Sequence, residues 1–207
     1  MLFRSSPMAS LCADLGAEAD DLDRIVGAID PAAWDAPTPA PRWTVRDQIA
    51  HLWCFDHRAL LSLTDPAAFA DDARWLAANG GAEASVALGR AMSPGELLDV
   101  WRQGRARLLT AAADLDPSAR VPWYGPSMSA RSCLTARLME TWAHGQDVAD
   151  LARPLILEER ASALAPQRVG LAIVVGRGLR HGKTHRSVAR CLGGILDRGQ
   201  TRSFTDL

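Results

Sequence analysis

Three side chains of types that bind metal ions lie in two segments with helical periodicity. Glu140 and His144 are four residues apart in METWAHGQDV, residues 139–148. That spacing places a carboxylate and an imidazole on one face of a helix, one turn apart. His51 lies far upstream in the second segment. Two imidazoles and a carboxylate on facing helices suit Zn²⁺ and leave one coordination position for water or a substrate.

The spacing alone leaves another interpretation open, in which His51 and His144 are ordinary buried or surface histidines. A Glu-x-x-x-His pair is common by chance. Two neighbouring polar residues support the metal interpretation, since Gln48 lies three residues before His51 and Asp147 three residues after His144. Either side chain could accept a hydrogen bond from the free ring N–H of a metal-binding histidine.

Aromatic and basic residues near the expected helix starts are candidates for binding a cofactor. Trp43, Trp123 and Tyr124 are expected in loops, where they could line the mouth of a pocket or pack against helix ends. Arg131 opens the helix that carries Glu140 and could pair with an anionic substrate, although a solvated arginine is the simpler interpretation. Trp43 and Arg131 are therefore the candidate cofactor-binding residues.

The cysteines indicate a reducing compartment. The four of them have irregular spacing and form no Cys-x-x-Cys pair: Cys12, Cys54, Cys133 and Cys191. The N-terminus, MLFRSSPMAS, lacks the apolar core of a secretory signal, so we expect reduced thiols and a cytoplasmic protein. Cys54 and Cys133 could share the faces that carry the metal ligands, but small buried thiols are the favoured interpretation.

The length, hydrophobic content and charge of the chain narrow the classes of protein to which it can belong. With 207 residues, 48% of them hydrophobic, the chain can build one sizeable domain with a full core. The net charge of −1 gives no electrostatic reason to expect a nucleic-acid partner. No apolar run approaches the roughly 20 residues that a membrane span needs, so we expect no membrane partner.

Helical periodicity dominates up to about residue 152. Local start and stop signals, such as Thr44 with Asp47 and Ser93-Pro94-Gly95-Glu96, fix several helix boundaries. The helices that these patterns predict are 8–29, 44–63, 66–78, 93–114 and 129–151. Strand signals are scarce. The sequence therefore predicts an all-α protein, with its four long helices in an antiparallel four-helix bundle.

The chain after Ala152 has a different composition. Up to Ala152 there are 13 Lys and Arg against 20 Asp and Glu, a net charge of −7, whereas from Arg153 there are 10 against 4, a net charge of +6. Apart from a short helix expected over 158–165, this part is rich in glycine and arginine and has little amphipathic order. We expect a helical bundle over 8–152 and an irregular basic tail over 153–207, which fits a truncated or altered second domain.

These motifs together resemble a known family. PTPAPRWTVRDQIAHL, residues 37–52, followed by the late METWAHGQDV, resembles the DinB-like, mycothiol-dependent maleylpyruvate isomerase metal-binding domains of actinobacteria. The stretch GPSMSARSCLTARLMETWAHGQDVAD is especially similar to a metal-binding subgroup of that superfamily. The resemblance covers residues 8–152. It implies a four-helix bundle that holds a divalent metal, usually zinc, through His51, Glu140 and His144.

The resemblance also implies partners. Enzymes of this family use the low-molecular-weight thiol mycothiol as a metal-bound thiolate, because a metal ion lowers the pKa of a thiol. In the isomerase the thiolate adds to a conjugated double bond, allows rotation and leaves, and relatives transfer thiols to other small electrophiles. Relatives usually continue into a second α/β domain that helps to build the pocket, a pattern from which the basic tail departs.

Two functions follow from the sequence. The first is a cytoplasmic, metal- and thiol-dependent isomerase or transferase, and the alternative is a non-catalytic, stress-related metal-binding protein. An open coordination position beside a pocket for a thiol favours the enzyme, and a closed site favours the alternative. The sequence leaves open whether the chain is an enzyme, which electrophile it uses and whether it forms a homodimer.

Overall fold

The computed structural model describes residues 6–163, all of which belong to one compact unit. Most of these residues are helical, which confirms the all-α class. In chain order the elements are α1 (Pro7–Val26), the short 3₁₀ helix η1 (Pro31–Asp35), α2 (Val45–Thr64), α3 (Pro66–Ala78), α4 (Ala82–Arg90), α5 (Pro94–Ala112), β1 (Arg120–Val121), β2 (Met128–Ser129) and α6 (Ala130–Ala163).

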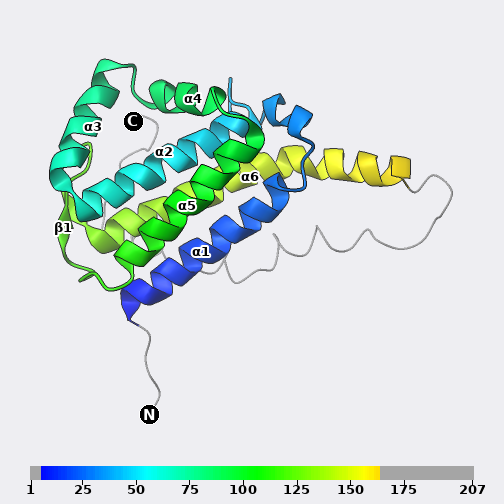
Figure 1. Ribbon diagram of the computed structural model, residues 1–207. Helices are drawn as coiled ribbons and strands as arrows, with labels where there is room; N and C mark the ends of the chain where they lie inside the picture. The colour runs from blue at the N-terminus through cyan, green and yellow to red at the C-terminus, as the bar shows by residue number, and fades with distance from the viewer. Residues whose placement is uncertain (1–5, 164–207) are drawn as a thin grey trace, which may run out of the picture. The chain divides into compact units, whose positions relative to one another are not determined.

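Four long helices, α1, α2, α5 and α6, pack against one another. The closest pairs are α1 with α6 and α2 with α5, while α2 also contacts α6 and α1 contacts α5. Figure 1 shows that α1 and α6 run in one direction and that α2 and α5 run in the other. The bundle is therefore antiparallel between these two pairs and parallel within each. Its α2–α6 interface joins the two segments that carry the predicted metal ligands.

The beginnings of α2 and α5 are fixed by local hydrogen bonds, as the sequence predicts. Thr44 accepts a hydrogen bond from the backbone N–H of Asp47, and the Asp47 carboxylate accepts one from the N–H of Thr44 at 3.0 Å. Ser93 and Glu96 form the same reciprocal pair at the start of α5. Each pair satisfies backbone donors that have no partner inside the helix.

The main differences from the sequence-based expectation are two helix ends and one additional helix. Helix α1 ends at Val26, three residues earlier than expected, and its C-cap is Gly27. Helix α4 was not predicted, because nine residues are too few to show a clear period. The expected end of the last helix near Leu151 is wrong, since α6 continues past Pro154 to Ala163. The residues after Pro154 are good helix formers, which offsets the loss of one backbone hydrogen bond.

The expected basic tail begins inside α6, and its part beyond Ala163 lies outside the described residues. The division into a bundle over 8–152 and a tail over 153–207 therefore stays a prediction.

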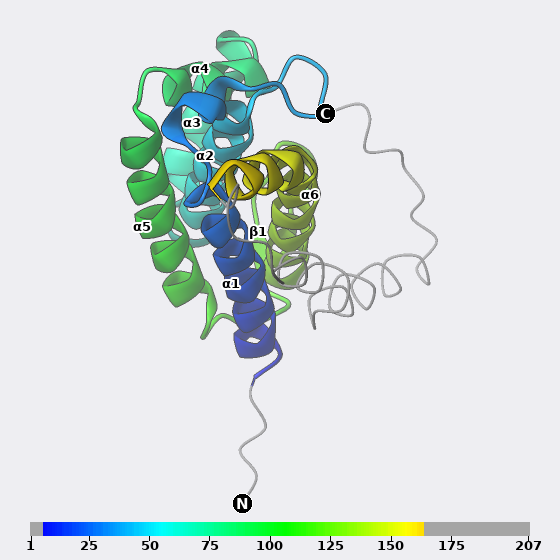
Figure 2. The ribbon, with the colours of Figure 1, turned by 90° about the vertical axis from the view of Figure 1, so that its right-hand side faces the viewer.

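Helices α3 and α4 pack on α2 and lie on the side of the bundle away from α1 (Figures 1 and 2). The contact between α4 and α2 is very close, because a Cβ atom on Gly89 would lie only 2.1 Å from the Cβ atom of Ala50. Glycine is required at this crossing. The core beneath is formed by buried side chains from all four long helices, among them Leu22, Ile49, Trp101 and Val148.

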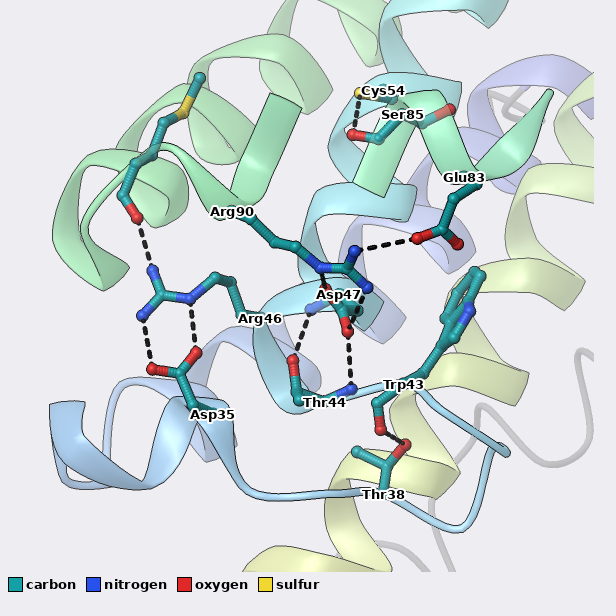
Figure 3. Close-up of polar contacts among 11 residues, drawn as sticks. Asp35, Thr38, Trp43, Thr44, Arg46, Asp47, Cys54, Glu83, Ser85 and Arg90 are labelled. Atoms are coloured by element: carbon teal, nitrogen blue, oxygen red, sulfur yellow. Dashed lines mark hydrogen bonds and ion pairs between the residues drawn. The ribbon is translucent and has the colours of Figure 1, made fainter. Parts of the chain in front are cut away.

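The loop before α2 is anchored to the bundle by several polar contacts (Figure 3). Arg46 pairs with Asp35 at 2.7 Å and also donates to the carbonyl of Met92 at 2.5 Å. Within the loop, the hydroxyl of Thr38 donates to the carbonyl of Trp43 at 2.9 Å. These contacts hold Trp43, which directly precedes the cap of α2, in a fixed position beside α6.

Candidate metal centre

The three predicted metal ligands meet at the α2–α6 interface. His51 comes from α2, while Glu140 and His144 lie one turn apart on α6. The Oε2 atom of Glu140 is 3.1 Å from Nε2 of His51 and 3.3 Å from Nε2 of His144. One donor atom from each residue lies within 4.8 Å of the other two. The structure thus brings together two imidazole nitrogens and one carboxylate oxygen from elements that are 89 residues apart in sequence.

The surroundings of this cluster favour the protonation states that metal binding needs. Burial lowers the pKa of His51 to about 4, and the side chain is 10% exposed. Burial alone would raise the pKa of Glu140, but its polar contacts with His144 and His51 and the charge of Arg137 outweigh it and hold this pKa far below its usual range. At neutral pH, His51 is therefore neutral and Glu140 is ionised, as a ligand set for a divalent cation requires.

Gln48 holds the second ring nitrogen of His144. Its Oε1 atom makes a short contact with Nδ1 of His144. Its Nε2 atom donates to the hydroxyl of Thr38 at 2.9 Å and to the carboxylate of Asp147 at 3.2 Å. Gln48 and Asp147 were the two candidates for this supporting role, and Gln48 is the one that contacts the imidazole. Thr38 had no signal in the sequence, because a threonine in a proline-rich loop belongs to no periodic pattern.

Aromatic rings border the cluster. The ring of Trp43 is stacked on His144, with centroids 5.5 Å apart and planes 12° from parallel, and it lies 5.1 Å from the ring of His51. Phe55, one turn after His51 on α2, is 4.4 Å from the His51 ring, and Tyr124 is 5.9 Å from Phe55. Of the loop aromatics that the sequence indicated, Trp43 is the one that contacts the ligand histidines.

The donor set fits a zinc-type ion. Three protein ligands of nitrogen and oxygen type leave one coordination position open, as in catalytic zinc sites. The side chain of Glu140 is 38% exposed, so the cluster is open to solvent on the carboxylate side. Nδ1 of His51 is buried and has no hydrogen-bond partner among the described residues, which leaves Nε2 as the only nitrogen of that ring directed at the cluster.

Two groups of candidate residues lie elsewhere. Arg131 is exposed and nine residues before Glu140 on α6, so their Cα atoms are about 13 Å apart along the helix axis. The thiol of Cys54 contacts the backbone carbonyl of Ser85 on α4, at 3.5 Å. Burial raises the pKa of both Cys54 and Cys133 to about 11, so both thiols are protonated at neutral pH. They are buried core thiols, as the favoured interpretation held.

A second charged cluster between α2 and α6 had no signal in the sequence. The carboxylate of Asp56 accepts hydrogen bonds from Nε of Arg137 at 2.9 Å and from Nε1 of Trp101 at 3.1 Å. All three side chains are buried. Arg137 lies one turn before Glu140 on α6, and its charge contributes to the low pKa of that carboxyl.

Comparison with known proteins places this helical bundle in a family. The model of the mycothiol maleylpyruvate isomerase N-terminal domain matches residues 15–149. The chain belongs to this family, which confirms the resemblance that its motifs indicated.

The most informative relatives are of two kinds. Two uncharacterised proteins from two strains of Mycobacterium tuberculosis are each 48% identical to the chain over 140 residues, which cover 67% of this chain and 54% of the relative. The crystal structure of the mycothiol-dependent maleylpyruvate isomerase matches with a TM-score of 0.54 and 20% identity, over 72% of this chain and 63% of that one. A histidine-to-alanine mutant of that enzyme matches with the same TM-score. At this identity the solved structures show a shared fold.

The matched region spans about half the length of the curated relatives. Within residues 6–163, no helix combines the length and the apolar character that are needed to cross a membrane.

Proposed function

We propose that this protein binds one divalent metal ion, zinc or a similar ion, through His51, Glu140 and His144, and uses it in a thiol-dependent isomerase or transferase reaction. The observation that carries the proposal is the convergence of three donor atoms from two helices within 4.8 Å. Ligands on rigid helices are held in place before the ion arrives, so that little ordering is left for binding.

The family to which the chain belongs supports the use of a thiol cofactor. A bound divalent ion supplies a positive charge that lowers the pKa of a nearby thiol. The matching solved structure is that of a mycothiol-dependent enzyme, so mycothiol is the first cofactor to test. The partner of the thiol would be a small electrophile. The buried, protonated thiols of Cys54 and Cys133 support a thiol that comes from outside the protein.

Each residue around the cluster would have a distinct role in binding the metal ion or the thiol. Glu140 contributes the negative charge that balances part of the charge of the cation, and His51 and His144 contribute neutral nitrogens. Trp43 and Phe55 cover parts of the histidine rings and keep water away from them. Of the two candidate cofactor-binding residues, Trp43 is beside the cluster and is the better placed to contact a bound thiol. Free, buried cysteines at positions 12, 54 and 133 support a reducing, cytoplasmic location.

Metal content tests the first part of the proposal. Purified protein should contain close to one equivalent of zinc or a similar ion, measured by elemental analysis. The His144→Ala variant should lose most of it, while His57→Ala, which changes an exposed histidine on the same α2 helix, should keep it. Unchanged metal content in His144→Ala would sink the assignment.

Cobalt substitution tests the second part. Co²⁺-loaded protein that is titrated with mycothiol should develop the charge-transfer absorption of a thiolate bound to cobalt, and a thioether analogue of mycothiol should not produce it. If metal binds but no thiol does, the non-catalytic metal-binding alternative is favoured. The match covers 54% of the relatives' length, so the activity of a whole relative is carried over to this chain only as a proposal.

A further inference from the structure

We propose that Gln48 is a positioning residue for His144, which fixes the proton of the imidazole on Nδ1 and so leaves Nε2 free to face the metal ion. The part of this inference that concerns metal affinity rests on the proposed function. The part that concerns the imidazole proton does not, because it follows from hydrogen bonds within the chain.

The hydrogen bonds that link Gln48 and Thr38 to a backbone carbonyl have a fixed order of donors and acceptors, which the carbonyl sets. The carbonyl oxygen of Trp43 can only accept, so the hydroxyl of Thr38, at 2.9 Å, must donate to it. The oxygen of Thr38 then accepts from the amide nitrogen of Gln48, also at 2.9 Å. Since a hydroxyl has a single proton, Thr38 cannot donate in both directions.

The carboxylate of Asp147 fixes the same orientation independently. It lies 3.2 Å from Nε2 of Gln48 and can only accept when ionised. If the amide of Gln48 were turned by half a rotation, its carbonyl oxygen would face the Asp147 carboxylate and two acceptors would be in contact. Both amide hydrogens of Gln48 are therefore committed, and its Oε1 atom must face His144.

The consequence is a defined tautomer of His144. Oε1 of Gln48 is an acceptor, so Nδ1 of His144 must carry the proton in the neutral ring. Nε2 then presents its lone pair toward Oε2 of Glu140, which lies 3.3 Å away. A lone pair that faces a carboxylate oxygen is unfavourable unless a cation lies between them, so this tautomer prepares the site for a metal ion.

Gln48 can hold this geometry because it is completely buried. Its side chain is 0% exposed, so water does not compete for its amide. His51 offers a contrast within the same site, because its Nδ1 atom is buried and has no hydrogen-bond partner in the part of the chain that the structure describes. We therefore expect the orientation of His144, and not that of His51, to depend on a single side chain.

The test is the tautomer of His144 in metal-free protein, read by long-range nitrogen–proton correlation NMR at a pH above the titration range of ordinary imidazoles. The wild-type ring should be protonated on Nδ1. In Gln48→Leu this preference should be lost, because Nε2–H can then donate to Glu140. In the double variant Gln48→Glu/Asp147→Asn it should be kept, since the carboxylate at 48 still accepts from Nδ1–H while the amide at 147 donates to it. The exposed Gln103→Leu, on α5, is the matched control and should change nothing.

Zinc affinity, measured by competition with a chromophoric chelator, gives the second reading. Gln48→Leu should bind zinc about 10- to 100-fold more weakly than wild type, the usual effect of losing such a partner, and Gln48→Glu/Asp147→Asn should bind more tightly than Gln48→Leu. If Gln48→Leu fails to fold, the tautomer of His144 in Gln48→Glu/Asp147→Asn still tests the inference. A wild-type ring protonated on Nε2, or an unchanged tautomer in folded Gln48→Leu, overturns the inference. An Nδ1-protonated ring in a protein that binds no zinc supports the inference and refutes the proposed function.

Discussion

Helices α2 and α6 bring polar side chains together at two neighbouring places, with opposite outcomes. At the first, Asp56 and Arg137 neutralise each other, and Trp101 occupies the second carboxylate oxygen of Asp56. At the second, Glu140 faces the nitrogens of His51 and His144, each of which can offer a lone pair. The first cluster supplies its own cation, a guanidinium, whereas the second gathers donors around a space that suits an external cation.

The difference shows how to distinguish a structural charge cluster from a binding site in the same interface. In the structural cluster, the two carboxylate oxygens of Asp56 each have a donor, and the carboxylate is buried. In the candidate site, the Glu140 carboxylate is 38% exposed and its partners are two imidazoles, which can offer lone pairs to a metal ion. Stability should therefore depend on the first cluster and metal affinity on the second, and substitutions can separate the two.

The largest effect on stability is expected from Asp56→Ala. This change would leave the guanidinium of Arg137 buried without its counter-charge and the indole N–H of Trp101 without an acceptor. Breaking a buried pair in this way costs about 3–5 kcal/mol. Urea unfolding of metal-free protein should show this loss, while any folded Asp56→Ala protein should still bind one metal ion. The control is Asp99→Ala, which removes an exposed partner of Arg102 and should cost less than about 1 kcal/mol.

The converse experiment is Glu140→Gln. The amide removes the negative charge between the two histidines, and metal affinity should fall by about 100-fold or more, at least as much as the loss of an outer hydrogen-bond partner. Stability of the metal-free protein should fall less than in Asp56→Ala, because the Glu140 side chain is 38% exposed and solvent screens its contacts. A chelator competition and a urea curve on the same sample measure both. Equal losses of stability in Glu140→Gln and Asp56→Ala would contradict the division between the clusters.

Glu18 on α1 is a buried carboxyl of a third kind. Among the described residues it has no cationic partner, and it belongs to neither of the two clusters. It is 4% exposed, its Oε2 atom has no hydrogen-bond partner among the described residues, and burial, with a contribution from Asp21, raises its pKa from 4.5 to about 7. The pKa of Glu18 is higher in the folded protein than in the unfolded one. The contribution of the protonated Glu18 carboxyl to stability is therefore full below the unfolded-state pKa and is lost as the pH rises through 7.

Glu18→Gln should therefore stabilise the protein mainly above neutral pH. The gain at about pH 8 should reach up to about 3 kcal/mol, and it should be close to zero below about pH 4. Thermal unfolding of wild type and variant across this range is the measurement, with the exposed Asp114→Asn as control. A gain that does not depend on pH would mean that the ionised carboxylate is not the cause.

The parts of the fold that the sequence predicted are those set by local chemistry. The starts of α2 and α5 follow from Thr44 with Asp47 and from Ser93 with Glu96, pairs that are complete within four residues. Helix α4 and the continuation of α6 were missed for the opposite reason. The short α4 is stabilised by its contact with α2 at Gly89, a packing effect that no local pattern records.

The candidate site divides in the same way. The Glu140–His144 pair is local and visible from spacing, whereas its meeting with His51 depends on how α2 packs on α6. Residue types suggested His51 as the third ligand, and the family resemblance supported it. Asp56 and Arg137 could not be predicted, because charged residues in a helical pattern are normally assigned to the solvent face. Thr38 is in contact with Gln48 only through the folded loop.

The smallest expected effect concerns the cysteines and separates a core thiol from a reactive one. Cys54 and Cys133 are buried and protonated at neutral pH, and Cys54 is directed to Ser85 rather than to the metal cluster. Replacing each with Ala should cost about 1 kcal/mol per site through lost packing. Metal content, the cobalt signal with mycothiol and any thiol-dependent turnover should stay close to those of wild type. Complete loss of turnover in a folded, metal-loaded Cys54→Ala protein would overturn this view and make Cys54 the nucleophile.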